Sequence, residues 1–230
     1  GNAGVALQQL WSINSNAAGI LKVGKPSLAL AYENKYNIKE LSSKSAAFVA
    51  PFPQFTLGST FTVYGNGHYA LSKSGLALAK KFGQKLFAAV KFNYHTIRIA
   101  GYGNESTFSV EAGFQTEVMR KFWLGAHIAN PNQSKFSSRN EELTPTHIRF
   151  GAAYYISDKI TISSEIEKLL NAAADFKMGL AYRLAGLLSL RTGFSASPFK
   201  QYGGIGISLH SLAFDISVSS HPVLGPSPQI

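Results

Sequence analysis

Residues 86–95, LFAAVKFNYH, and residues 108–115, FSVEAGFQ, alternate apolar and polar side chains at every second position. In the first stretch Leu86 and Phe92 share one face, whereas Lys91 falls on the other. Successive side chains of an extended chain point to opposite faces, so a period of two predicts β-strands. The same alternation recurs through most of the chain, which predicts an all-β protein.

The alternating runs and the turns between them divide the chain into about fourteen candidate strands. These strands cover residues 27–34, 45–52, 55–64, 68–81, 84–100, 105–118, 121–129, 146–157, 159–168, 174–184, 187–196, 202–209 and 212–219, and a last one starts near residue 229. Most of them reach the roughly 9 residues that a tilted strand needs to cross a bilayer. The connections after the even-numbered strands are tight and the others are mostly longer, which is typical of outer-membrane barrels.

The two faces of these strands differ in chemistry. One face is apolar, for example at Phe150, Phe176 and Phe214, and the other face carries ions of both signs. The ions that we expect to form one network are Lys91, Glu111, Glu165, Glu167, Asp175, Lys177, Arg183, Arg191 and Asp215. Within this network we expect Lys177 or Arg183 to balance the carboxylates of Glu165 and Glu167.

Two architectures can accommodate such faces: a soluble sandwich with the apolar face inside, and a membrane barrel with that face turned to lipid. Burying so many ions in a dry core would cost several kcal/mol for each ion. A membrane barrel exposes the same ions to a wet lumen. We therefore predict a transmembrane antiparallel β-barrel and keep a soluble β-sandwich binding protein as an alternative.

Composition is compatible with one domain, because the 230 residues contain no evident linker. The net charge is +10, and the basic residues are scattered over turns and loops. No nucleic-acid-binding motif accompanies them, so we expect no nucleic-acid partner. Lysines near the anionic headgroups of lipid and lipopolysaccharide explain the charge, and these molecules are the expected surroundings.

The sequence shows no recognisable catalytic or metal-binding motif. A Gly-x-Ser-x-Gly motif is absent, and His147, His221 and Asp215 have no diagnostic spacing. The histidines also lack the spacing of metal ligands. We therefore predict a protein that is not an enzyme and that has no cofactor.

Residues 1–25 do not alternate and are rich in Gly, Ala and Asn, so we expect them to form a segment separate from a barrel of residues 26–230. The charged face of the strands carries seven glycines: Gly113, Gly125, Gly151, Gly179, Gly193, Gly204 and Gly206. Glycines in strands mark either the close approach of another backbone or strand curvature. Under the first explanation residues 1–25 plug the lumen.

The N-terminal run GNAGVAL, the motif Asn16-Ala17-Ala18-Gly19 and the later runs Arg149-Phe150-Gly151-Ala152 and Leu190-Arg191-Thr192-Gly193-Phe194 together resemble the FadL/PorV superfamily. Where that family has Asn-Pro-Ala-Gly, this chain lacks the proline. The chain is most similar to the small PorV-like proteins of the Bacteroidota. The resemblance implies a fourteen-stranded outer-membrane barrel whose plug includes Asn14, Asn16, Ala17, Ala18 and Gly19. It also implies a closing strand ending in an aromatic residue, so we expect the closing strand at Ile230 to be incomplete.

The resemblance implies two functional branches. One branch transports hydrophobic small molecules passively, and the other serves the type IX secretion system as a scaffold for exported proteins. A hydrophobic route should be greasy, whereas the predicted lumen is charged and the loops are short. We therefore expect a non-enzymatic scaffold or accessory subunit of a protein-export complex with membrane or secreted protein partners, and keep the FadL-like transporter as an alternative.

Overall fold

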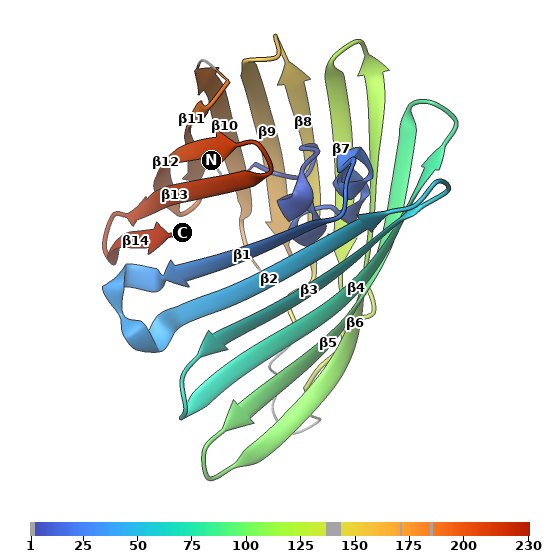
Figure 1. The fold of residues 1–230 in the computed structure, drawn as a ribbon. Helices are drawn as coiled ribbons and strands as arrows, with labels where there is room; N and C mark the ends of the chain where they lie inside the picture. Colours follow the sequence, from blue (N-terminus) through green and yellow to red (C-terminus); the bar gives the residue numbers. More distant parts are fainter. Residues whose placement is uncertain (1–2, 137–143, 171, 185) are drawn as a thin grey trace.

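The computed structural model describes residues 3–136, 144–170, 172–184 and 186–230. It is a closed barrel in which every strand pairs with its neighbours in the sequence and β1 meets β14. All the strand pairs are antiparallel, for example β4 with β5 and β8 with β9. Figure 1 shows the barrel from the side. The predicted all-β barrel of about fourteen strands is therefore confirmed.

The strands lie close to the predicted positions. Their bounds are β1 Ser27–Asn34, β2 Ser42–Pro51, β3 Thr56–Gly65, β4 Tyr69–Phe82, β5 Leu86–Ile99, β6 Gly103–Met119, β7 Phe122–Ala129, β8 His147–Tyr155, β9 Ile160–Leu169, β10 Ala174–Leu184, β11 Leu188–Ala196, β12 Phe199–Leu209, β13 Leu212–His221 and β14 Gly225–Gln229. Only the last strand was misplaced. It begins at Gly225 rather than near Gln229, and it pairs with β13 from Gly225 onward.

The apolar face of the strands points out of the barrel. Phe92, Phe150 and Phe214 are 63%, 59% and 61% exposed, whereas Lys91 and Glu165 on the opposite face are 1% and 2% exposed. A soluble sandwich would reverse this arrangement, because it would pack the phenylalanines together in its centre. The alternative of a soluble sandwich is therefore wrong, and the exterior is an apolar band suited to acyl chains.

The connections differ between the two rims. The links after β2, β4 and β6 are tight, and we call their end of the barrel the tight-turn rim. At the opposite rim the β1–β2 link contains the short 3-10 helices η3 (Lys35–Asn37) and η4 (Lys39–Leu41), and the β7–β8 link runs from residue 130 to residue 146. Other links at that rim, such as residues 66–68 after β3, are short. The predicted sorting of loops therefore holds for only some of the connections.

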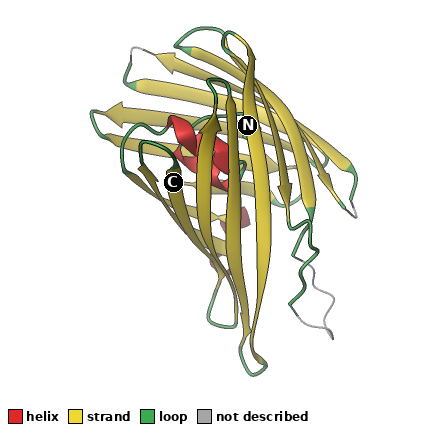
Figure 2. Ribbon diagram, turned by 90° about the vertical axis from the view of Figure 1, so that its right-hand side faces the viewer, coloured by secondary structure: helices red, strands yellow, loops and turns green. Residues whose placement is uncertain are grey.

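Residues 3–25, which we call the N-terminal segment, lie inside the barrel. They form two further 3-10 helices, η1 (Leu10–Asn14) and η2 (Ala17–Lys22). The helix η1 contacts β2 and β3, and η2 contacts β4, β5 and β6. Figures 1 and 2 show both helices enclosed by the strands. Within the described residues, no helix is long and apolar enough to cross a membrane.

Candidate functional site in the lumen

The start of the N-terminal segment is held by a buried carboxylate. Glu165 Oε2 accepts hydrogen bonds from the backbone N–H groups of Gly4 and Val5, both at 2.8 Å. The other oxygen, Oε1, lies 3.7 Å from Arg149 Nε and 3.6 Å from Lys177 Nζ. A carboxylate buried to this degree needs such partners, because an unpaired one would be strongly disfavoured. The segment therefore completes the hydrogen bonding of a charge in the barrel wall.

Asn16 is the second anchor of the segment and is fully buried. Its Nδ2 donates to the carbonyls of Val5 at 2.9 Å, Phe114 at 3.0 Å and Ala126 at 3.2 Å. Its Oδ1 accepts from Ala18 N at 3.2 Å and caps η2. One amide thus ties η2, the start of the segment and strands β6 and β7 together. The missing proline of the resembled motif does not prevent this turn.

The barrel wall contributes two further donors. Gln115 Nε2 donates to the carbonyls of Val5 at 2.9 Å and Leu7 at 3.1 Å. Lys91 Nζ donates to Ile13 O at 2.9 Å. Its contact with Oδ1 of the exposed Asn14 is longer, at 3.4 Å. The alternation in residues 108–115 puts Gln115 on the same face as Glu111, but a glutamine carries no charge that would indicate a partner.

Three lumen glycines make room for the segment. A Cβ added at Gly113 would collide with the Asn16 amide, one at Gly125 with the Val5 carbonyl, and one at Gly151 with the Val5 side chain and a carbonyl of β9. The close-approach explanation is therefore confirmed at these three positions. It is wrong for Gly204 and Gly206, where an added Cβ would meet Ser217 and Asp215 of the neighbouring strand β13.

A belt of ion pairs follows the lumen wall from β4 to β10, and we call it the charged belt. Glu111 lies 2.7 Å from Lys73 Nζ and 3.3 Å from His127 Nε2. Glu167 pairs with Arg149 Nη2 at 2.7 Å and with Lys177. The expectation that Lys177 balances Glu165 and Glu167 is met, but the second cation is Arg149 rather than Arg183.

Other members of the predicted network lie apart from the belt. Arg183 is exposed near the tight-turn rim and has no ion pair with the described residues. Asp175 accepts from Ser195 Oγ at 2.8 Å and from the backbone N–H groups of Ala196 and Ser197 at the end of β11. Arg191 pairs with Asp215 at 2.7 Å on the far side of the lumen. The predicted ions therefore do not form one network: Arg183, Asp175 and the pair of Arg191 and Asp215 lie apart from the belt.

An apolar cluster fills the lumen beside the tight-turn rim, and we call it the apolar chamber. It comprises Ile13, Ala17, Ala18 and Ile20 of the segment against Ala47, Val49, Ala77, Ala79, Phe87, Ala89 and Trp123 of the wall. The rings of Phe87 and Trp123 lie 5.0 Å apart. The lumen, predicted to be charged, is therefore charged only in part. The sequence did not indicate this chamber, because many of its wall residues are alanines that lie among polar residues on the lumen face.

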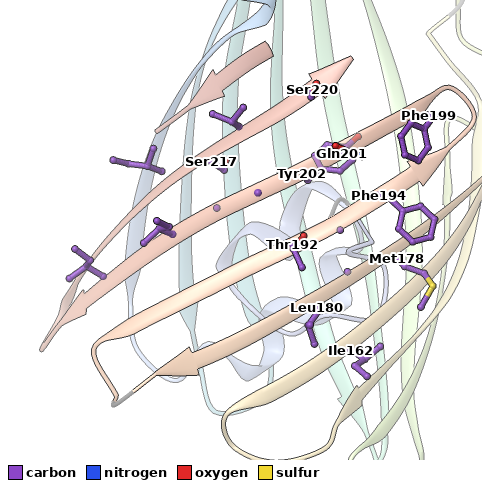
Figure 3. A pocket seen from close by; sticks show the side chains of 18 of the residues that line it. Ile162, Met178, Leu180, Thr192, Phe194, Phe199, Gln201, Tyr202, Ser217 and Ser220 are labelled. Carbon is purple, nitrogen blue, oxygen red and sulfur yellow. The ribbon is translucent and has the colours of Figure 1, made fainter. Parts of the chain in front are cut away.

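A cavity of about 1290 Å³ is an apolar groove on the outer surface. In register across the wall lie Leu180, Thr192, Gly203 and Val218. Because Thr192 and Gly203 are smaller than their neighbours, the surface is hollow there. Figure 3 shows Phe194, Phe199 and Met178 along one side of this groove. A membrane-facing groove of this kind suits an apolar occupant.

The residues considered for catalysis are not brought together. Asp215 is paired with Arg191, whereas His221 Nδ1 accepts from the backbone N–H groups of Val223 and Leu224 in the β13–β14 turn. His147 lies beside His127, with 5.7 Å between the ring centroids. These placements do not provide the hydrogen-bonded chain from nucleophile to base that a triad requires.

No protein-family model matches the chain, and no curated protein matches it. Among the solved structures that share its fold are two transporters and a channel. The toluene transporter TbuX of Ralstonia pickettii is 12% identical with a TM-score of 0.74, and the match covers 100% of this chain and 93% of that one. The toluene transporter TodX of Pseudomonas putida is 9% identical with a TM-score of 0.74, over 99% and 92%. The monoaromatic hydrocarbon channel CymD is 10% identical with a TM-score of 0.71, over 98% and 92%.

At these identities the likeness concerns the fold, and it spans the whole chain. It supports the barrel that the FadL-superfamily resemblance implies, but gives no support to the PorV-like subtype or to type IX secretion. The strands close into a barrel with an apolar exterior, and the N-terminal segment occupies its lumen. All three features fit a single architecture. The protein is a transmembrane β-barrel of the bacterial outer membrane.

Proposed function

We propose that the protein is a non-enzymatic channel for the passive transport of small hydrophobic molecules across the outer membrane, with the N-terminal segment as its plug. The observation that carries the proposal is the apolar chamber, where the segment meets the wall through aliphatic and aromatic side chains. When the segment moves, it exposes an apolar lining that suits a hydrocarbon better than an ion. The shared fold of TbuX, TodX and CymD supports the same reading.

The charged belt is compatible with the transport of hydrophobic molecules. Its ions are paired with one another and lie along the wall, whereas the apolar chamber lies at another level of the lumen. A hydrophobic solute also finds an apolar surface in the outer groove, whose lining includes Phe194 and Ile205. Apolar surfaces thus lie on both sides of the wall.

A reversible lock on the segment tests both transport and the role of the plug. An added Cβ at Gly58 would lie 3.4 Å from Ile13 Cγ1 and would meet no backbone atom among its nearest neighbours. In an Ile13→Cys/Gly58→Cys variant the sulfur at position 13 would replace Cγ1 beside the added Cβ at position 58, so the two thiols would lie within reach of each other. The chain has no other cysteine, so the engineered bond would be the only one.

The measurement is uptake of radiolabelled toluene by cells that have an outer membrane but lack their own hydrocarbon channel. We expect the native protein to accelerate uptake, the oxidised double variant to lose this gain, and a reducing agent to restore it. The single Ile13→Cys variant, treated identically, controls for the redox treatment. Uptake that is the same with and without the native protein would refute transport, whereas full uptake through the oxidised variant would refute only the plug.

The scaffold function is the second candidate, and one observation favours it. Glu165, Gln115 and Lys91 of the wall bind the segment between residues 4 and 13, and its own Asn16 binds two carbonyls of the wall. These contacts are more than a readily displaced plug needs. Such a closed barrel could serve as a rigid subunit of an export complex. Pull-down from native membranes in mild detergent distinguishes the two functions: a stoichiometric protein partner supports the scaffold, and copurified hydrocarbon or acyl chains support the channel.

A further inference from the structure

A second cavity of about 420 Å³ lies in the lumen, on the side that the charged belt does not reach, and we call it the polar pocket. It is bounded by β11–β14, by β1 and by the N-terminal segment. Its lumen-facing side chains are all polar: Gln9, Glu33, Arg191, Tyr202, Asp215, Ser217, Ser219, Ser227 and Gln229. The transport of hydrophobic molecules gives this pocket no role.

The centre of the pocket is an ion pair built across an intervening strand. Arg191 on β11 and Asp215 on β13 meet at 2.7 Å although β12 separates them. They can meet because β12 presents Gly204 and Gly206 to the lumen, and a Cβ at Gly206 would collide with the Asp215 carboxylate. These two glycines therefore place the ion pair in the pocket.

The pair retains hydrogen-bonding capacity toward the cavity. The side chains of Arg191 and Asp215 are 46% and 43% exposed. A guanidinium has five N–H donors and a carboxylate has two acceptor oxygens, so a single contact leaves most of them free for a ligand. Tyr202, Ser217 and Ser219 add hydroxyls, which both donate and accept.

The net charge of the pocket lining limits the class of ligand that the polar pocket can bind. Arg191 and Asp215 neutralise one another, and Glu33 leaves the lining with one excess negative charge. An anion would therefore be repelled. An apolar molecule would leave the polar groups of the lining without partners, which is costly. A molecule rich in hydroxyl groups satisfies donors and acceptors together.

We propose that the polar pocket is a binding site for a hydroxylated solute of monosaccharide size that carries no negative charge. The cavity lies at the small end of the range for ligand sites, which suits one sugar ring rather than an oligosaccharide. The solute contacts the ion pair of Arg191 and Asp215 on one side and Gln9 of the segment on the other. The site does not depend on the hydrophobic route, because it shares no lining residue with the apolar chamber.

Three sugars of equal size and different charge provide the test: D-glucose, D-glucosamine and D-glucuronate. Binding is measured by saturation-transfer NMR on the full chain, purified in a detergent without a sugar headgroup. We expect saturable binding of glucose and glucosamine at millimolar concentration and at least tenfold weaker binding of glucuronate. Toluene at saturation should leave the glucose signal unchanged.

The variants locate the binding. Ser219→Trp should abolish glucose binding by filling the cavity, and Asp215→Asn, which preserves its shape, should weaken binding about tenfold through loss of a charged acceptor. Arg191→Gln should weaken it similarly, whereas Arg183→Gln, which removes an unpaired lumen-face arginine outside the pocket, should not. Glucuronate binding more tightly than glucose, equal binding of glucose to the native chain and to all three pocket variants, or no saturable binding of any sugar would overturn the proposal.

Discussion

Glu165 shows how one side chain couples the barrel to its contents. It accepts two backbone N–H groups of the segment and faces two cations of the wall. Glu165→Ala would leave Arg149 and Lys177 with one carboxylate fewer, and the loss of one partner of a buried ion pair typically costs about 3–5 kcal/mol.

We expect Glu165→Ala to lower the urea midpoint of unfolding in micelles and to expose the segment to protease. Glu105→Ala, which removes an exposed carboxylate of β6, is the matched control and should change stability by no more than about 0.5 kcal/mol. Equal behaviour of the two variants would show that Glu165 does not anchor the segment.

Substitutions of glycine by alanine on the two faces of the wall should change stability in opposite directions. Gly113→Ala drives a Cβ into the Asn16 amide, so it should weaken docking of the segment despite alanine's smaller loss of backbone entropy. Gly203→Ala meets nothing within 4 Å on the outer face and should be neutral or slightly stabilising. Thermal unfolding of the two variants in the same detergent measures the difference.

The face on which each charged side chain lies was predictable from the sequence, but its ion-pair partners were not. The alternation placed Glu167 and Lys177 on the lumen face, and the structure pairs them. Arg149, which the sequence did not indicate as a partner, pairs with Glu167 because the strand register places the two opposite each other across β8 and β9. Register follows from turn geometry and from packing between distant strands, and a single sequence records these only indirectly.

At the scale of elements, the lack of alternation in residues 1–25 indicated that they form no strand, but it did not predict the two helices η1 and η2. Its short 3-10 turns have too few residues for a clear period. The last strand was misplaced for a related reason: Gly225, Pro226 and Pro228 are atypical of strands, and pairing with β13 compensates for them.

The docked segment should protect its own side chains from water-soluble reagents. The chain has no cysteine, so a Ser12→Cys variant carries one thiol at a position that is 1% exposed. We expect a membrane-impermeant maleimide to label this thiol slowly, and much faster once Asn16→Ala removes the three carbonyl contacts of the anchor.

Asn14→Cys is the positive control for this experiment, because Asn14 is exposed inside the lumen and should be labelled rapidly in both backgrounds. Rapid labelling of Ser12→Cys with the anchor intact would mean that the segment is not held in the lumen as described.

At the scale of the whole molecule, the distribution of apolar side chains determines stability in the membrane. Phe150→Arg places a cation on the lipid face near the middle of β8, where such a change costs about 2–4 kcal/mol in membrane barrels. Phe150→Leu keeps the site apolar and should cost far less. Urea titration of folding into lipid vesicles compares the two variants, and similar costs would argue against lipid contact at this position.

The orientation of the two faces was predictable from the sequence, because alternation records it in every strand. The sorting of the lumen into charged belt, apolar chamber and polar pocket was not, because it depends on which lumen residues the closed barrel brings to the same level. This arrangement bears on function. The lumen ions, which in the sequence favoured a scaffold, are paired along the wall and are not part of the apolar chamber.

The account depends on the apolar side of every strand contacting lipid. Spin labels at Phe92, Glu111, Phe150, Phe214 and Asp215, one per variant of the protein reconstituted in bilayers, test this directly by relaxation with lipid-soluble oxygen and with a water-soluble nickel chelate. We expect oxygen to dominate at the three phenylalanine positions and the chelate to be favoured at Asp215, with Glu111 shielded from oxygen. Phenylalanine positions that were shielded from oxygen, with Asp215 accessible to it, would contradict the account.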